Sequence, residues 1–139
     1  MASRFRHRVG RRGAGLLFFA LLDLVYAYSL LAPTDAARNS ESFRFIADIL
    51  PLWGWAIAWA AVGVTCLVQA FAAHDRVGFA AAMGLKVLWG VLFLLGGLVA
   101  GLERGYVSAA IWLTFAAWIG VIATWPEPGK EIGWTRRSG

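Results

Sequence analysis

The feature that most constrains this chain is an apolar run over residues 77–101, which reads VGFAAAMGLKVLWGVLFLLGGLVAG. A helix needs roughly 20 mostly apolar residues to cross a bilayer at about 1.5 Å of rise per residue, and this run is long enough. It carries one charged residue, Lys86, well inside it. Because a buried ammonium group needs a partner, the rest of the chain has to supply one or Lys86 has to extend to an interface.

Three further apolar runs cover residues 14–32, 51–73 and 106–125. Hydrophobic residues make up 60% of the 139 residues and charged ones 15%, whereas soluble domains are nearer 45–50% apolar and about 25% charged. A soluble chain of this length could not cover such runs with so little polar surface. We therefore predict an all-α integral membrane protein, a four-helix bundle with four spans.

Polar segments flank these runs. Residues 1–13 form a basic arm that we expect to lie against anionic lipid head groups, and residues 126–139 form a basic tail. At the end of the polar loop 34–49, the segment FRFIADIL has Phe43, Ile46 and Leu50 at helical spacing, which predicts a short interfacial helix. A cleaved signal peptide is the alternative for the first run, but Asp23 interrupts that run and no small-x-small cleavage site follows it.

The basic residues predict the orientation. Four spans put both chain ends on one side, and that side collects nine Lys and Arg residues against three on the other, which favours both termini in the cytoplasm. The net charge of +5 does not indicate nucleic-acid binding, because no recognition module accompanies it. The nine are Arg4, Arg6, Arg8, Arg11, Arg12, Arg76, Lys130, Arg136 and Arg137, and the three are Arg38, Arg44 and Arg104.

Asp23 is the ionisable residue of the first run, and topology brings it to the level of Lys86. It lies about ten residues past Gly13, and Lys86 lies about nine past Val77, so both are about 13–15 Å from the inner boundary of helices that run in the same direction. A charge at the bilayer centre costs about 2.5–3.5 kcal/mol on insertion scales. We expect an internal Asp23–Lys86 bridge that fixes helix register.

Two other interpretations of these residues stay open. Lys86 could extend to the inner interface while Asp23 is protonated. Alternatively, Asp23 could be a proton or ion relay, or the pair could line a polar path in an oligomer. Trp53, Trp55 and Trp59 near the start of the second run are typical of an aromatic belt at the outer interface.

Small residues recur at a spacing of four, which lets membrane helices approach closely. We favour packing within one bundle over self-association for these candidate packing residues. They are Gly97 with Gly101, Ala80 with Gly84, and Ala116 with Gly120.

Enzyme chemistry has little support. His7 and His74 lie in polar segments, Cys66 is the single cysteine, and no nucleophile stands beside a base. No cluster of residues has metal-ligand spacing. We expect no catalytic site, metal or cofactor.

Several short motifs resemble those of small four-span membrane proteins of actinobacterial phages. They are the Arg-rich start, PLWGW at 51–55, DRVGF at 75–79, LWG at 88–90, and Trp125 with Pro126. The resemblance implies a role in the host cytoplasmic membrane. One possibility is a holin-like protein that self-associates and permeabilises the membrane, for which Gly97, Gly101, Asp23 and Lys86 are the residues to test. The alternatives are a non-lytic anchor, a superinfection-exclusion or accessory protein that binds another membrane protein, and a small channel or transporter subunit.

Overall fold

The computed structural model describes residues 10–72 and 74–126, and the regular structure within these ranges is entirely helical. This confirms the predicted all-α class for the described residues. The four long helices are α2 (Arg11–Leu31), α5 (Leu52–Gln69), α6 (Arg76–Val99) and α7 (Gly105–Ala123), and the two short ones are α3 (Asp35–Arg38) and α4 (Glu41–Ile49).

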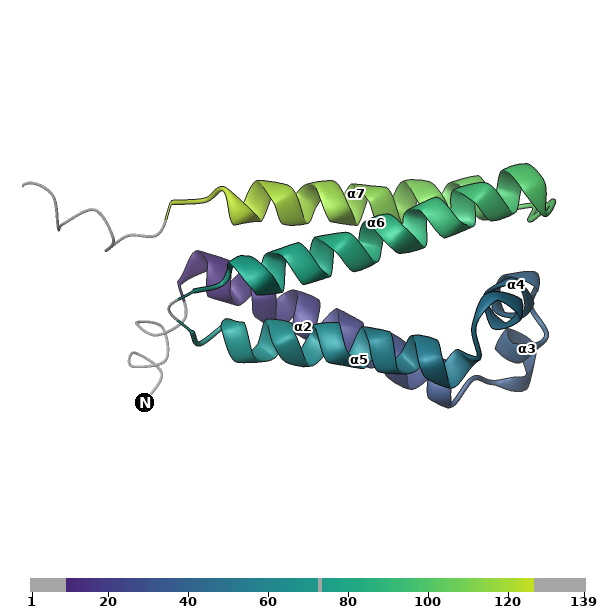
Figure 1. Ribbon diagram of the computed structural model, residues 1–139, viewed down its shortest axis with the longest axis horizontal. Helices are drawn as coiled ribbons and strands as arrows, with labels where there is room; N and C mark the ends of the chain where they lie inside the picture. The colour runs from purple at the N-terminus through teal and green to yellow at the C-terminus, as the bar shows by residue number, and fades with distance from the viewer. Residues whose placement is uncertain (1–9, 73, 127–139) are drawn as a thin grey trace, which may run out of the picture.

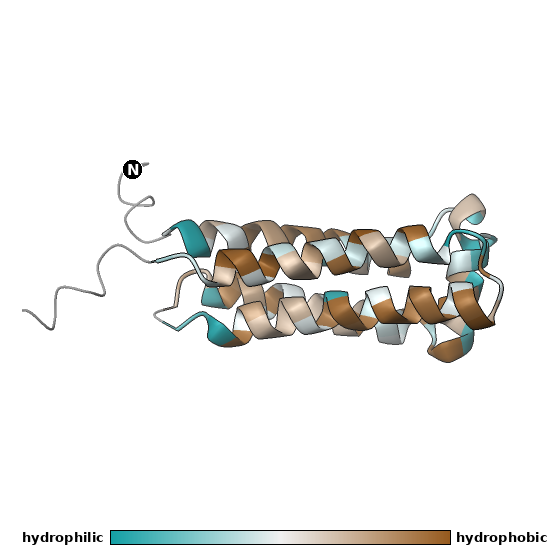
Figure 2. Ribbon diagram, turned by 90° about the horizontal axis from the view of Figure 1, so that it is seen from above, coloured by the Kyte–Doolittle hydropathy of each residue, from teal (hydrophilic) through white to brown (hydrophobic). Residues whose placement is uncertain are grey.

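Each of the four long helices is long and apolar enough to cross a membrane. Figure 2 shows hydrophilic residues concentrated at the two ends of the elongated molecule. Many large apolar side chains between these ends point outward, with Leu21 and Ile57 exposed by 65% and 60%. Outward apolar surface on this scale suits lipid rather than water, so the chain is a membrane protein.

The helix ends lie within a few residues of the predicted spans. The largest differences are at the start of α2, which takes in Arg11 and Arg12 from the expected arm, and at the end of α5, which stops at Gln69. The rest of the basic arm, residues 1–9, and the tail from residue 127 onward lie outside the described residues.

The long helices associate as two antiparallel pairs (Figure 1). α2 packs along α5 and α6 packs along α7, while α5 also packs on α6 and joins the pairs. The start of α2 and the end of α7 lie at one end of the molecule, which we call the terminal end (Figure 1). α3, α4 and the turn between α6 and α7 lie at the opposite end, which we call the loop end.

Local sequence explains where the elements at the loop end start and stop. The Thr34 and Ser40 hydroxyls accept hydrogen bonds from the backbone N–H groups of α3 and α4, as expected of N-caps. Gly101 has a φ of 70°, a left-handed conformation that favours glycine, and the N–H of Leu102 donates to the carbonyl of Gly96 at 3.1 Å. This arrangement ends α6.

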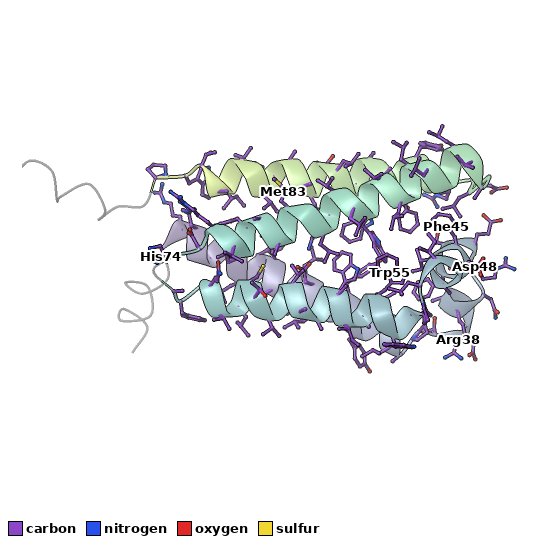
Figure 3. The ribbon with its side chains drawn as sticks, viewed as in Figure 1. Arg38, Phe45, Asp48, Trp55, His74 and Met83 are labelled. Carbon is purple, nitrogen blue, oxygen red and sulfur yellow. The ribbon has the colours of Figure 1, made fainter. Side chains whose placement is uncertain are left out.

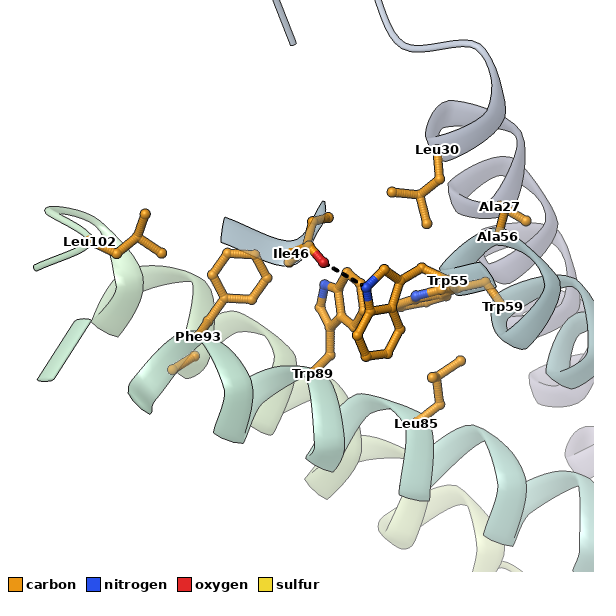
Figure 4. Close-up of a cluster of buried hydrophobic side chains, with 11 residues drawn as sticks. Ala27, Leu30, Ile46, Trp55, Ala56, Trp59, Leu85, Trp89, Phe93 and Leu102 are labelled. Atoms are coloured by element: carbon orange, nitrogen blue, oxygen red, sulfur yellow. Dashed lines mark hydrogen bonds between the residues drawn. The ribbon is translucent and has the colours of Figure 1, made fainter. Parts of the chain in front are cut away.

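α4 folds back onto the long helices. Its buried residue Ile46 offers its carbonyl to the indole N–H of Trp55 in α5, at 2.9 Å (Figure 4). This helix contains most of the segment for which an interfacial helix is predicted. One hydrogen bond and one buried side chain therefore fix α4 across the loop end.

The buried core has two parts. The loop-end cluster is rich in aromatic rings and is drawn in Figure 4: Ala27, Leu30, Ile46, Trp55, Ala56, Trp59, Leu85, Trp89, Phe93, Leu102 and Ala109. The terminal-end cluster has smaller side chains: Leu16, Phe19, Ala20, Cys66, Ala70, Phe79, Ala82, Ile119 and Ile122.

Candidate functional site

Asp23 and Lys86 meet at the junction of the two clusters. On α2, Asp23 lies between Ala20 of the terminal-end cluster and Ala27 of the loop-end cluster. Both charged side chains are 0% exposed, and the Lys86 ammonium donates to Oδ1 of Asp23. The structure thus brings together two residues that are 63 positions apart in the sequence.

Trp59 of α5 covers the ammonium group. The Lys86 Nζ lies 4.6 Å from the centroid of the Trp59 ring, within the range of a cation–π interaction. Two buried polar atoms here, Oδ2 of Asp23 and Nε1 of Trp59, have no hydrogen-bond partner among the described residues. The positive charge of Lys86 is therefore balanced on two sides, by Asp23 and by the Trp59 ring, whereas one polar atom of each of these two neighbours is left without a hydrogen bond.

Aromatic rings close the site on the loop-end side. The Trp89 indole N–H donates to the Tyr26 hydroxyl at 3.2 Å, and the Tyr26 ring lies 4.3 Å from that of Trp59. Trp59 and Trp89 meet edge to face at 5.3 Å. These three side chains come from α2, α5 and α6, so one network of rings joins three helices beside the charge pair.

On the terminal-end side, Gly78 links α5 to α6. The Cys66 thiol donates to the carbonyl of Gly78 at 3.5 Å, and the N–H of Gly78 donates to Oε1 of Gln69 at 2.6 Å. A Cβ at Gly78 would lie 3.2 Å from Cδ2 of Leu16, so α6 approaches α2 closely here. These contacts fix the depth of α6 relative to α5.

Chemically, this arrangement neutralises two charges and holds α2 against α6. Truncating one member of such a buried pair leaves an uncompensated charge, which is why the pair constrains register. Among the described residues, no group of three His, Cys, Asp or Glu side chains could hold a metal ion.

The two glycines of the GxxxG pattern, Gly97 and Gly101, have different roles in the structure. A Cβ on Gly97 would lie 3.4 Å from the backbone N of Tyr106 and 3.5 Å from Cα of Gly105, so Gly97 permits a close crossing of α6 and α7. Gly101 lies beyond the end of α6 and terminates the helix rather than packing on a helix face.

The other small residues divide differently. Ala116 is buried, whereas Ala80 and Gly84 are exposed on α6. A Cβ on Gly84 would meet nothing within 4 Å, and one on Gly120 would meet only Sδ of Met83, at 3.8 Å. Gly84 therefore faces outward, and Ala80 and Gly120 line a space beside α6 and α7 rather than filling an internal contact.

Sequence reasoning missed the aromatic side of the site. Trp53 is 63% exposed as an interfacial residue would be, but Trp55 and Trp59, predicted for the same aromatic belt, are buried. The prediction fails for these two because they face α6 rather than lipid. A usable signal was present, since Tyr26 follows Asp23 and Trp89 follows Lys86 by three residues, on the same helix faces.

Comparison of the chain with protein-family models, curated proteins and solved structures finds no match. The resemblance to actinobacterial phage membrane proteins stays a prediction.

Proposed function

We propose that this chain is a non-catalytic protein of the cytoplasmic membrane, a four-helix bundle with both termini in the cytoplasm. In this proposal it acts as a closed module that binds another membrane protein, as an anchor or accessory subunit. The observation that carries the proposal is the complete enclosure of Asp23 and Lys86. The excess of Lys and Arg on the side of the two chain ends supports the orientation.

The outward faces of the long helices support a closed module over a pore. A wide aqueous path needs polar side chains along its wall, but the Thr65 and Thr114 hydroxyls donate to carbonyls of their own helices. Apart from Asp23 and Lys86, the Asp, Glu, Lys and Arg residues of these four helices are confined to the first turns of α2 and α6. A lesion would therefore require the helices to repack.

The test is inducible expression in a bacterial host while membrane potential is followed with a voltage-sensitive dye. The proposal predicts a stable potential at high membrane abundance of the protein. Sudden depolarisation would contradict it and favour the holin-like, self-associating alternative. A steady, ion-specific current that Asp23→Asn abolishes would instead favour a channel or transporter subunit.

The structure changes which variant should accompany this test. Gly97 lies at a crossing within one chain, so Gly97→Ile would disturb the fold and could not isolate self-association. Gly84 faces open space, so Gly84→Ile changes the outer surface with little internal cost. Depolarisation that Gly84→Ile delays would identify a lesion built from several copies.

A further inference from the structure

α6 and α7 separate toward the terminal end. Near the loop end they touch through backbone, since a Cβ on Gly105 would lie 2.5 Å from the carbonyl oxygen of Phe93. Midway along, a Cβ on Gly90 would lie 2.7 Å from Leu113. At Gly120 of α7, nearer the terminal end, the only atom within 4 Å of an added Cβ is Sδ of Met83, at 3.8 Å. The gap opens progressively from one end to the other.

The open part of this gap is a cleft of about 370 Å³, in which Met83 lies between α6 and α7 (Figure 3). It combines two arginines with an apolar wall. Among its lining residues are Arg12 from α2, Arg76, Phe79 and Met83 from α6, and Ile119 and Gly120 from α7.

The cleft carries an excess of positive charge. Arg12 pairs with Asp75 through Nη2 at 2.8 Å, and its guanidinium lies 5.3 Å from the centroid of the Phe79 ring. The Arg12 Nε is buried and has no hydrogen-bond partner among the described residues. Arg76 is exposed and forms no ion pair within the described part of the chain. The two guanidinium groups that line the cleft thus have one paired carboxylate between them, Asp75, which binds Arg12.

We propose that this cleft binds one anionic phospholipid, with the phosphate at Arg76 and Arg12 and an acyl chain along Phe79, Met83 and Ile119. Seven residues separate Arg76 from Met83, which is about 10 Å along a helix and matches the step from head group to upper acyl chain. The site would lie in the inner leaflet if the orientation proposed above is right, but its chemistry does not depend on that orientation.

Other occupants fit the cleft less well. A free phosphate would use the arginines but not the apolar wall. A partner helix is about 10–12 Å across with its side chains and would need a groove along the whole of α6 and α7, whereas these helices are in close contact at the loop end. A lipid uses both the charge and the local apolar surface.

The test is native mass spectrometry of the full chain in detergent, titrated separately with phosphatidylglycerol, phosphatidylcholine and inorganic phosphate. We expect one phosphatidylglycerol to be retained in preference to phosphatidylcholine, and no retained phosphate. Arg76→Gln should weaken this binding about fivefold, the loss expected for one arginine at an anionic surface. Arg104→Gln, at the loop end, is the matched control and should bind as the original chain does.

A second variant tests the apolar wall. Gly120→Leu should fill the cleft and reduce phosphatidylglycerol retention. If this variant melts at a lower temperature than the original chain, Ala80→Leu replaces it, because Ala80 also lines the cleft and is exposed. Equal retention of the two lipids would overturn the proposal, as would unchanged binding by folded Arg76→Gln. Retention of phosphate without lipid would also overturn it, by showing a simple anion site.

Discussion

The two ends of the α6–α7 pair are built from similar residues and pack in opposite ways. At the loop end, Gly97 and Gly105 bring the backbones so close that an added Cβ on Gly105 would collide with Gly97. Toward the terminal end, Gly120 of α7 lies beside a cleft, and a Cβ added to it would meet only Sδ of Met83, at 3.8 Å. Equivalent glycines therefore close the pair in one place and leave it open in another.

The difference follows from the side chains that fill the core on each side of the charge pair. The loop-end cluster contains Trp55, Trp59, Trp89 and Phe93, and α4 covers it through the Trp55–Ile46 hydrogen bond. The terminal-end cluster is made largely of smaller side chains and leaves the cleft beside it. Large rings with few rotamers build a well-defined closed half.

Removing the Lys86 ammonium group, which lies where the two core clusters meet, should have the largest effect on stability. Lys86→Met keeps most of the side-chain volume but leaves Asp23 buried without its counter-charge, so we expect a loss of about 3–5 kcal/mol in the free energy of unfolding. Denaturation of the detergent-solubilised protein by sodium dodecyl sulfate, followed by circular dichroism, measures this loss. A change within experimental error would show that the two halves do not depend on the pair.

Gly105→Ala tests the closed half. Its Cβ would lie 2.5 Å from the Phe93 carbonyl oxygen and 2.7 Å from the Gly97 N, both backbone atoms that cannot rotate away. The helices must separate, and overpacking of this kind costs about 1–3 kcal/mol. The same denaturation measurement checks it, and full stability would mean that α6 and α7 do not cross closely at this point.

Gly120→Ala is the matched change in the open half and should have the smallest effect. The only atom within 4 Å of the added Cβ is Sδ of Met83, at 3.8 Å, and alanine is favoured over glycine inside a helix by about 0.5–1 kcal/mol. We expect stability to be unchanged or to rise by up to about 1 kcal/mol. A clear loss of thermal stability would indicate that this face of α7 is packed against α6, and the contrast between the two halves would disappear.

Sequence predicted the coarse fold because length and hydropathy alone decide it. Four long apolar runs gave four long helices, and the residue count from each helix start put Asp23 and Lys86 at one depth. Depth needs only the rise per residue, which is constant along an α-helix. The proximity of the two side chains in the structure follows from that simple count together with their opposite charges.

Rotation about each helix axis is what the sequence could not supply. The helices are apolar on nearly all sides, so hydropathy does not tell a lipid-facing residue from a buried one. Trp53 and Trp55 illustrate this, because they lie two residues apart and yet only Trp55 is buried. The same ambiguity hid the different roles of Gly97, Gly84 and Gly101, which share only their small size.

The most direct test of the central claim, that Asp23 and Lys86 act as one enclosed structural pair, is a double-mutant cycle on the free energy of unfolding. We expect Lys86→Met alone and Asp23→Leu alone each to be strongly destabilised, and the double variant to recover most of the loss because no unpaired charge is left buried. A double variant no more stable than either single variant would contradict the claim.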